Sequence, residues 1–560
     1  MTLTGAEYIL KKISLLGVKT IFGIPGAHID PLFVAAAKSE IEAVINTQEL
    51  SSGYMADGYS RAGHKIGVLI GISGPGSNNM VTAVNTARIE KVPLLVITGG
   101  MPLKLSVVPG FQCGNEFGTR DDAIFKPITK YSKRVNTIRS LAMSLEEAVN
   151  IALSPPFGPV HLIVPYDIFN ATTKLQPHAV DFDALKYWKS NHSESTVNRI
   201  AELLNGDKKV VFWIGDTLNR KEQTADILAL AEQFHIPVAT SFSAKGVIPE
   251  GHELALGNFG YAGSQLSKGV FLSEEPDVII GFDIEQNERN SLNWNPDLFG
   301  RKKILLINYP GCFTAEQFGE SVNDNPFYIL KSLRKLLDTE TYDTSGRKQW
   351  LNNLKQQFDV GLPPLATPKT GEIEPGRLIQ IMQQKLPKDS ILFVDSGAHR
   401  VFAGFHWKSP LPESYYSASV VAPLGWALAA GLGAAFSRKE PVLVFTGDGC
   451  MQMHGIELKT AIKHNKAVLV VINNNSAFGA VYNRYKKASH KAADMVSITE
   501  IDWTLFAKSF GAEVFDIYTE AEFSKHILDF LTDKKLTILN VRTPVSPYIH
   551  DISLAKSAYA

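Results

Sequence analysis

The stretch VFTGDGCMQMHGIELKTAIKHNKAVLVVINNN, residues 444–475, contains two short apolar runs that each end in polar residues. The first run leads into Gly447-Asp448-Gly449, and the second leads into Asn473-Asn474-Asn475. A helical pattern fills the interval, so the stretch predicts a strand, a helix and a second strand. Because successive strands of a parallel sheet end at the same edge, we expect Asp448 and Asn475 to converge there.

The residue types at this edge suit a metal ion that carries a diphosphate. A carboxylate, an amide oxygen and a backbone carbonyl are ligands for Mg²⁺, which shares its octahedral shell with phosphate oxygens. Gly447 and Gly449 allow a close backbone approach, and the start of the helix offers free N–H groups. An ordinary strand–turn–helix with a polar tip is the alternative for Gly-Asp-Gly taken alone. The asparagine run after the next strand favours the metal and diphosphate site.

The rest of the chain repeats the alternation of buried strands and helices. Short β-branched runs predict strands in three series, at 66–72, 92–98 and 160–164, at 208–214, 277–282 and 303–309, and at 390–397, 441–449, 467–475 and 536–543. Continuous apolar strands between helices indicate parallel sheets covered on both faces. Polar segments at 171–195 and 339–370 separate the series. We therefore predict an α/β protein with three doubly wound parallel-sheet domains, at 1–175, 190–340 and 365–560.

Composition narrows the class of protein. Positive and negative residues balance at 56 each in 560 residues, which argues against a nucleic-acid or membrane-surface partner. The three cysteines fit neither a disulfide framework nor a metal site, and the N-terminus lacks the apolar core of a signal peptide. We expect a reducing compartment, the cytoplasm. The longest charge-free run, 414–437, contains proline and glycines, so it predicts a buried loop and a small-residue helix rather than a membrane span.

Gly-Asp-Gly followed by the asparagine run resembles the signature of thiamine diphosphate-dependent enzymes, and the resemblance covers essentially the whole chain. It is nearest to the group that contains acetolactate synthases, benzaldehyde lyases and 2-oxoacid decarboxylases. The resemblance implies that the three domains are pyrimidine-binding, central and diphosphate-binding. It also implies that Asp448, the Asn475 side chain and the Ala477 carbonyl ligate Mg²⁺, and that Gly447, Gly449 and Cys450 contact thiamine diphosphate.

The segment INTQELSSGYMADGYSR, residues 45–61, resembles the part of the family that carries its activating glutamate. In the family this glutamate hydrogen-bonds a pyrimidine ring nitrogen of the cofactor and favours the imino tautomer, whose exocyclic nitrogen then takes the proton from the reactive carbon. Glu49 occupies that position. A surface carboxylate at the start of a helix is the alternative for Glu49 taken alone.

Three further segments match cofactor contacts of the family. GISGPGSNN at 71–79, DSGAHRVFAGFHW at 395–407 and APLGWALAAGLGAA at 422–435 carry them, and the loop PGAHID at 25–30 also meets the cofactor in the family. The last of the three offers Leu424 as the apolar wedge that bends the cofactor. The residues implied by these segments are Gly26, Ala27, Ser73, Gly74, Pro75, Asn79, Ala398, His399 and Leu424.

Two positions bear on the reaction. His28 in GAHID resembles the active-site histidine of benzaldehyde lyases, and Phe111-Gln112 resembles the Phe-Gln of acetolactate synthases, whereas decarboxylases carry a His-His pair there. A histidine moves protons near neutral pH, and a glutamine only donates or accepts hydrogen bonds. A loop histidine bonded to a backbone carbonyl is the alternative for His28. Arg484, near Ala480, either binds a substrate carboxylate or simply faces solvent beside Lys486 and Lys487.

Together these features imply a thiamine diphosphate- and Mg²⁺-dependent carboligase or lyase that acts on small 2-oxoacids or aldehydes. A non-oxidative 2-oxoacid decarboxylase is the alternative. Because Glu49 and Asp448 lie in different domains, the resemblance implies a site shared by two chains, hence a homodimer at minimum and commonly a homotetramer. The central domain gives WIGDTLN and INYPG where flavin-binding relatives have glycine-rich and aspartate motifs, which makes FAD doubtful. The donor and the acceptor stay open.

Overall fold

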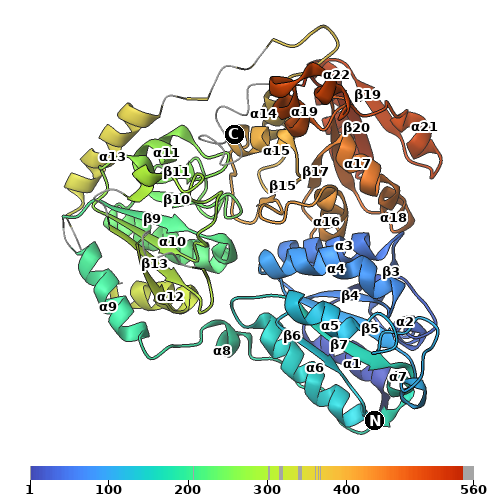
Figure 1. The fold of residues 1–560 in the computed structure, drawn as a ribbon. Coiled ribbons are helices and arrows are strands. Elements are labelled where there is room, and N and C mark those ends of the chain that lie inside the picture. Colours follow the sequence, from blue (N-terminus) through green and yellow to red (C-terminus); the bar gives the residue numbers. More distant parts are fainter. Residues whose placement is uncertain are drawn as a thin grey trace.

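The computed structural model describes residues 2–205, 207–299, 303–313, 319–337, 343–359, 361–362, 365 and 367–545. Three lobes follow one another along the chain and meet in a triangular arrangement, as Figure 1 shows. Each lobe holds one parallel sheet of six strands with helices on both faces, which confirms the predicted α/β class and the three doubly wound domains. The predicted domain limits at 340 and 560 lie outside the described residues.

The N-terminal sheet has the strand order β3-β2-β4-β5-β7-β6. Its central strands are apolar and buried along their whole length, because helices cover both faces. The strands are β2 (Thr20–Gly23), β3 (Glu42–Ile45), β4 (Gly67–Ile72), β5 (Leu94–Gly100), β6 (Tyr131–Arg134) and β7 (Val160–Pro165). The helices are α1 (Gly5–Leu15), α2 (Asp30–Ala36), α3 (Glu49–Gly63), α4 (Pro75–Ile89), α5 (Asp121–Phe125), α6 (Ile138–Leu153) and α7 (Tyr166–Asn170). A two-stranded antiparallel ribbon, β1 (Leu3–Thr4) with β8 (Thr172–Thr173), joins the two ends of this domain.

The C-terminal sheet repeats the same topology in the order β16-β15-β17-β18-β20-β19. Its strands are β15 (Ile391–Val394), β16 (Tyr415–Tyr416), β17 (Val442–Gly447), β18 (Val468–Asn474), β19 (Val514–Ile517) and β20 (Thr537–Arg542). Its helices are α14 (Pro375–Lys385), α15 (Ala398–His406), α16 (Trp426–Ala434), α17 (Asp448–His454), α18 (Leu458–Lys463), α19 (Gly479–Ala488), α20 (His490–Asp494), α21 (Trp503–Lys508) and α22 (Glu520–Asp533). The charge-free run at 414–437 contains the short strand β16, a loop that is partly exposed at Val420, and the nine-residue helix α16, so the small-residue helix is confirmed and the fully buried loop is not. Within the described residues, no helix is long and apolar enough to cross a bilayer.

The central sheet has a different order, β11-β10-β9-β12-β13-β14, in which the chain turns back at the β9–β12 pair. Its strands are β9 (Val210–Ile214), β10 (Val238–Thr240), β11 (Ala255–Asn258), β12 (Val278–Phe282), β13 (Lys303–Asn308) and β14 (Glu320–Asn323), and its helices are α9 (Ser193–Leu204), α10 (Lys221–Phe234), α11 (Gln265–Leu272), α12 (Pro326–Leu337) and α13 (Ser345–Phe358). The short α8 (Phe182–Lys186) lies in the connection before it. Trp350 and Leu351 of α13 pack into the central core, although α13 follows the predicted limit at 340. The domain limits stay a prediction.

The two terminal domains pack against each other through α3 and α16, which lie side by side in Figure 1. Glycines make this contact possible. A Cβ atom placed on Gly58 would lie 1.9 Å from the Ala430 carbonyl oxygen, and one placed on Gly433 would lie 1.9 Å from the Met55 carbonyl oxygen. The two helix backbones are therefore too close for any larger residue at these positions.

Replacing Gly58 with alanine should weaken the contact between the terminal domains. The added methyl group has no room beside the Ala430 carbonyl, so we expect a loss of about 1–3 kcal/mol in the free energy of unfolding, measured by urea denaturation. Gly346→Ala is the matched control, because an added Cβ atom on this glycine of α13 would have no neighbouring atom within 4 Å. That control should gain up to about 1 kcal/mol. Equal stability of the two variants would contradict the packing of α3 on α16.

Candidate functional site

The predicted metal ligands lie at the carboxyl edge of the C-terminal sheet. Gly447 at the end of β17 is in register with Asn473 of β18, so Asp448 and the Asn474-Asn475 pair follow side by side. The chain then curls back: the Asn475 Oδ1 atom accepts a hydrogen bond from the Ala477 N–H at 3.2 Å. The backbone N–H groups of Ser476 and Ala477 also reach the Asp448 carboxyl group.

Asp448 has the character of a cation ligand. Its side chain is 4% exposed, and burial raises its pKa to about 6, against the hydrogen bonds from backbone N–H groups that lower it. One carboxylate oxygen accepts from the Gly449 N–H at 3.0 Å, whereas the other, Oδ2, is buried and has no hydrogen-bond partner. Such a group is costly in the interior unless a partner binds it. The donor set is one carboxylate with amide and carbonyl oxygens, and the described residues contain no cluster of three or more His, Cys, Asp or Glu that could bind a metal.

Small residues shape the backbone around Asp448. A Cβ atom on Gly447 would lie 3.2 Å from His399 Cε1, and one on Gly449 would lie 2.7 Å from a Phe478 ring carbon. His399 is 4% exposed, burial lowers its pKa to about 3, and its Nε2 atom is buried without a hydrogen-bond partner. His399 is therefore neutral and holds a buried polar atom beside the Gly447–Asp448 turn. Ala398 lies next to the same cluster, 3.6 Å from where a Cβ on Gly479 would be.

Asp395 at the end of β15 organises the neighbouring turn, a role that the sequence did not reveal. Its carboxyl group accepts from the Gly425 N–H at 2.9 Å and from the Thr446 hydroxyl at 3.0 Å, and burial raises its pKa to about 6. Gly425 adopts a left-handed conformation (φ 79°) directly after Leu424, which is half-buried. The Cys450 thiol donates to the Ser396 carbonyl at 3.2 Å, and burial raises the pKa of this thiol. The polar residue directly after a buried strand, in VDSG, was the available signal for Asp395.

The second group of predicted residues lies at the carboxyl edge of the N-terminal sheet. Glu49 follows β3 and is 9% exposed; its Oε2 atom accepts from Asn79 Nδ2 at 3.0 Å. The space beside this carboxylate is bordered by Gly71 and Gly76, and a Cβ on Gly76 would lie 3.3 Å from Glu49 Oε1. Asn79 belongs to α4, which starts at Pro75 directly after the left-handed Gly74 (φ 80°).

His28 lies in the turn after β2, next to Gly26 and the exposed Ala27. The Gly26 carbonyl accepts from the Ile29 N–H at 2.8 Å, which closes this turn. A Cβ on Gly99 of β5 would lie 2.3 Å from the His28 carbonyl oxygen, so the loop presses against the sheet. The Nδ1 atom of His28 is buried without a hydrogen-bond partner, and burial lowers its pKa. The loop-histidine alternative requires a carbonyl partner for the ring, and the described residues provide none at Nδ1.

Gln112 reaches the same edge from the segment after β5. Its backbone is left-handed (φ 50°), and its Cα atom lies 3.4 Å from where a Cβ on Gly74 would be. A buried network anchors this segment: Asp121 accepts from the Ser77 hydroxyl at 2.8 Å and from the Thr119 hydroxyl at 2.7 Å. The Ser73 hydroxyl is buried nearby without a partner. The neighbouring Phe111 is 75% exposed, so a large apolar side chain faces solvent beside Gln112 in the single chain.

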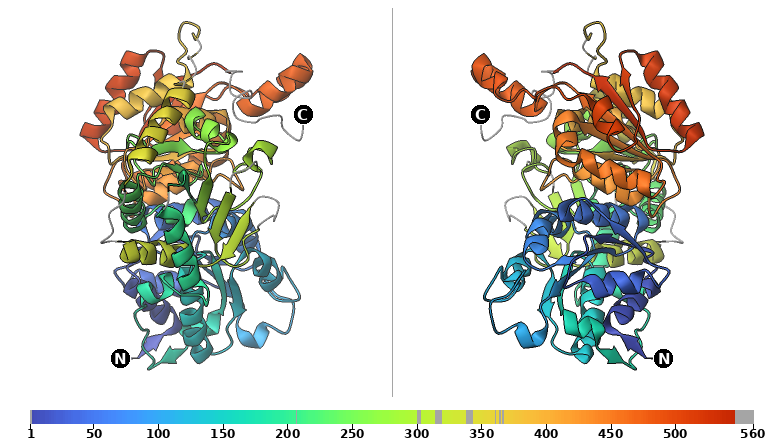
Figure 2. Two further views of the ribbon diagram at one scale, coloured as in Figure 1. Left: turned by 90° about the vertical axis from the view of Figure 1, so that its left-hand side faces the viewer. Right: turned by 90° about the vertical axis from the view of Figure 1, so that its right-hand side faces the viewer.

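Ala480 and Arg484 lie on α19, which projects from the body of the C-terminal domain in the side views of Figure 2. Arg484 is exposed, as are its neighbours Lys486 and Lys487, so the described chain does not decide between substrate binding and a solvent-facing role. The segment at 101–120 projects on the same side of the molecule as α19.

The predicted residues fall into two groups, one at the carboxyl edge of each terminal sheet. Hydrogen bonds between the terminal domains involve residues of α3 and those just before it, Glu42 of β3 and Glu90 after α4. Among the described residues, none of the hydrogen bonds or ion pairs joins Glu49, His28 or Gln112 to Asp448 or Asn475. We call the two groups half-sites.

The central domain has the strand order of dinucleotide-binding folds, whose ligands lie at the β9–β12 reversal. Here protein groups of two domains meet at that position. The Asp283 carboxylate accepts from the Thr217 N–H at 3.0 Å and forms an ion pair of 2.7 Å with Lys91, which enters from the N-terminal domain. Asp216, half-buried nearby, has its pKa raised by burial. Lys91 and Arg220 line the same small cavity as Asp216, so the position carries charges of both signs, and the doubt about FAD stays a prediction.

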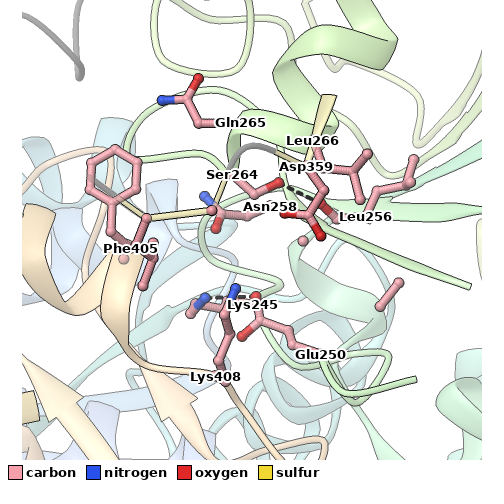
Figure 3. A pocket seen from close by; sticks show the side chains of 15 residues that line it. Lys245, Glu250, Leu256, Asn258, Ser264, Gln265, Leu266, Asp359, Phe405 and Lys408 are labelled. Atoms are coloured by element: carbon pink, nitrogen blue, oxygen red, sulfur yellow. Dashed lines mark hydrogen bonds and ion pairs between the residues drawn. The ribbon is translucent and has the colours of Figure 1, made fainter. Parts of the chain in front are cut away.

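A cavity of about 290 Å³ lies between the central domain and the far end of α15 (Figure 3). Its floor holds the buried ion pair between Lys245 and Glu250, at 2.7 Å, with Lys408 beside it. None of the residues that line this cavity belongs to the predicted cofactor or metal set.

Three family models match the chain in sequence order, and each corresponds to one observed sheet domain. They are the N-terminal TPP-binding domain at residues 3–118, the central domain at 197–313 and the C-terminal TPP-binding domain at 395–541 of thiamine pyrophosphate enzymes. The chain belongs to the thiamine pyrophosphate enzyme family. Its full-length similarity is to acetolactate synthases, so it is an acetolactate synthase-like member.

Relatives in this family are distant but span the whole chain. The acetolactate synthase isozyme 1 large subunit of Escherichia coli K12 is 25% identical over 547 residues, covering 96% of this chain and 94% of the relative. The acetolactate synthase large subunit of Corynebacterium glutamicum is 27% identical over 492 residues, covering 86% and 76%. The structure of the thiamine diphosphate-dependent 4-hydroxybenzoylformate decarboxylase of Rhodococcus jostii RHA1 superposes with a TM-score of 0.80 at 20% identity, over 97% of this chain and 100% of that one.

The two half-sites fit thiamine diphosphate and its metal. The unpartnered Asp448 oxygen and the curled Asn475–Ala477 segment suit a cation, and the Gly447 and Gly449 positions leave room for a diphosphate. A Cβ on Gly76 would crowd Glu49 Oε1 at 3.3 Å, so the glycine keeps that side of the carboxylate free of a side chain. Thiamine diphosphate binding follows from the family; the individual roles of these residues, and Mg²⁺ as the metal, stay predictions.

Asp448→Asn should abolish the Mg²⁺-dependent binding of thiamine diphosphate, measured by calorimetric titration. Because burial raises the pKa of Asp448 to about 6, protons should compete with the metal in the wild type, and cofactor affinity should fall as the pH drops from about 8 to about 5. Asp494→Asn, an exposed carboxylate of the same domain, is the matched control and should bind normally. Tight binding by Asp448→Asn would remove this residue from the metal site.

Proposed function

We propose that this chain is a thiamine diphosphate- and Mg²⁺-dependent carboligase or lyase that forms or cleaves a carbon–carbon bond next to a carbonyl group. The proposed substrates are small 2-oxoacids and aldehydes. One observation carries the proposal: Glu49, His28 and Gln112 come from three different segments and gather at one sheet edge, which has a histidine and a glutamine around the expected acceptor. The similarity to acetolactate synthases over the full chain supports it.

In this proposal the bound cofactor supplies an acidic carbon that adds to the donor carbonyl. Glu49 hydrogen-bonds the pyrimidine ring, and Asn79 fixes the direction of its carboxylate through the 3.0 Å hydrogen bond. Asp448, Asn475 and Ala477 hold the metal, while Ala398, His399, Gly447, Gly449 and Cys450 border the diphosphate. Leu424, placed by the Gly425 turn, would contact the cofactor as an apolar side chain.

His28 and Gln112 act on the acceptor. Since burial lowers the pKa of His28, its ring is neutral at neutral pH and exchanges one proton with the carbonyl oxygen of the acceptor. Gln112 donates a hydrogen bond to the same oxygen, but its amide has no proton acidic enough to transfer near neutral pH. This division favours ligation, in which a second carbonyl must be held in place, over simple protonation and release. Phe111, Ala480 and Arg484 border the acceptor side, with Arg484 available to a carboxylate.

The complete site requires two chains. No hydrogen bond or ion pair joins the two half-sites within the described part of one chain. The proposal therefore places the N-terminal edge of one subunit on the C-terminal edge of its partner, in a homodimer or homotetramer. Large apolar side chains stand exposed on both edges, at Val107, Phe111, Met453 and Met495. A partner chain would cover them. With three free cysteines, the reducing cytoplasm is the proposed location.

A non-oxidative 2-oxoacid decarboxylase is the second candidate. The fold is shared with a 4-hydroxybenzoylformate decarboxylase, and the cofactor half of the chemistry would be the same. The two candidates differ in the fate of the bound fragment, which is either transferred to a second carbonyl or protonated and released.

Incubation with pyruvate, thiamine diphosphate and Mg²⁺, followed by mass spectrometry of the products, separates the candidates. We expect acetolactate or an acyloin from the wild type. Glu49→Gln should bind the cofactor and yet lose product formation and exchange of the reactive C2 proton, by about 100-fold or more. Acetaldehyde as the sole product would favour the decarboxylase, and unchanged C2 exchange in Glu49→Gln would remove Glu49 from its role. If pyruvate is inert, a panel of 2-oxoacids and aldehydes replaces it.

His28→Ala should keep cofactor binding and C2 exchange, because His28 faces the acceptor and not the pyrimidine. Its rate of carbon–carbon bond formation should fall by about 100-fold, which is the size of a lost proton-transfer step. His28→Asn, which restores hydrogen bonding without titration, separates orientation from proton transfer. Full ligation by His28→Ala would exclude both roles for this histidine.

A further inference from the structure

The start of α3 has no cap of its own, although it carries Glu49 as its first residue. The preceding residue, Gln48, is extended (φ −155°, ψ 157°) and makes no side-chain capping hydrogen bond. A helix start without a local cap leaves its backbone position to other contacts. The residues just before it, Asn46 and Thr47, form hydrogen bonds with the C-terminal domain.

The group that holds them is the carboxylate of Glu457, which is 0% exposed. Its Oε2 atom accepts from the Thr47 N–H at 3.1 Å and from the Thr47 hydroxyl. Its Oε1 atom accepts from Asn46 Nδ2 at 2.9 Å and from the Thr460 hydroxyl at 2.7 Å. No ion pair of Glu457 occurs among the described residues, so four hydrogen-bond donors alone stabilise a buried carboxylate. Three of these four hydrogen bonds cross from one domain to the other.

The element that carries Glu457 also contacts α3 just beyond Glu49. Glu457 ends the single turn Gly455–Glu457 that follows α17. The ring of His454, at the end of α17, lies 2.9 Å from the Ser51 hydroxyl through its Nδ1 atom and packs edge-on against Tyr54. The C-terminal domain thus forms hydrogen bonds with Thr47, just before α3, and with Ser51, in its first turn, on either side of Glu49 in the sequence. The Glu49 carboxylate itself takes no part in these hydrogen bonds.

We infer that Glu457 is a positioning residue for Glu49. Its carboxylate fixes the backbone at Asn46–Thr47, and this fixes where the first residue of α3 presents its carboxylate. Glu457 itself touches neither cofactor nor substrate. The inference rests on the proposed role of Glu49 in the cofactor site. A displacement of about 1 Å at such a group lowers the rate of the step that it serves by up to about 100-fold.

Glu457→Gln tests this inference with little change in volume. The glutamine amide would point a donor at either Thr47 or Asn46, which are donors themselves. We expect C2 proton exchange in the holoenzyme, followed by nuclear magnetic resonance after acid quench, to slow by about 10- to 100-fold while thiamine diphosphate affinity changes by less than about threefold. In the cofactor-free protein, amide hydrogen exchange of the peptide that spans residues 46–52 should accelerate.

Tyr416→Phe is the matched control. The Tyr416 hydroxyl donates to the Arg61 carbonyl at 3.3 Å, so this variant also loses a hydrogen bond between the C-terminal domain and α3, at the opposite end of the helix. It should keep the wild-type rate of C2 exchange even if its melting temperature falls as much. If Glu457→Gln does not fold, Thr47→Val removes only the hydroxyl donor and should still slow C2 exchange.

Wild-type C2 exchange in Glu457→Gln, or in Thr47→Val, would overturn the inference. Equal slowing in Tyr416→Phe would also overturn it, because it would show a general effect of domain contact. Glu49→Gln separates this failure from that of the proposed function: if Glu49→Gln loses exchange and Glu457→Gln does not, only the positioning role fails. If Glu49→Gln keeps exchange, the proposed function of Glu49 fails first.

Discussion

Helices α3 and α16 pack backbone against backbone. Gly58 of α3 faces a carbonyl oxygen of α16, and Gly433 of α16 faces a carbonyl oxygen of α3, at positions where any larger residue would place a side chain. This close contact determines how the N-terminal and C-terminal sheets face each other. It also places the start of α3, with Glu49, beside the turn that ends in Glu457, and it places α16 directly after the Leu424–Gly425 turn. Both candidate half-sites therefore depend on one contact in which the two helix backbones approach closely at Gly58 and Gly433.

The residues around the contact between α3 and α16 are in part buried polar groups. Arg61, beside Trp426, forms an ion pair with Asp57, and Glu90 accepts from the Val420 N–H at 2.7 Å. Burial raises the pKa of Glu90 to about 7 even with Arg61 nearby. Such groups are stable only when their partners are in place, so they specify one relative arrangement of the domains. The same cost of burial applies to the Asp448 Oδ2 atom, which has no hydrogen-bond partner among the described residues.

The strands that the sequence indicated are those with continuous apolar runs, such as β4 and β17, because strands buried on both faces carry no competing pattern. The short edge strands β14 and β16 escaped prediction, since β14 is polar and partly exposed and β16 has two residues. The sequence predicted those site residues that lie in a motif directly after a strand, as Asp448 and Asn475 do. Glu457 and His454 lie in an ordinary helical pattern, and only their contacts with Thr47 and Ser51 distinguish them. The ion pair at the β9–β12 reversal joins Asp283 to Lys91 of a different domain, which no local sequence pattern could connect with it.

The proposed sharing of each site between two chains has a genetic consequence. If each working centre combines the N-terminal edge of one subunit with the C-terminal edge of another, a chain damaged at Glu49 and a chain damaged at Asp448 have complementary defects. In a mixed dimer one centre would collect both defects and the other would collect neither. Two inactive alleles expressed in the same cell would then restore part of the activity, whereas two alleles damaged in the same domain would not.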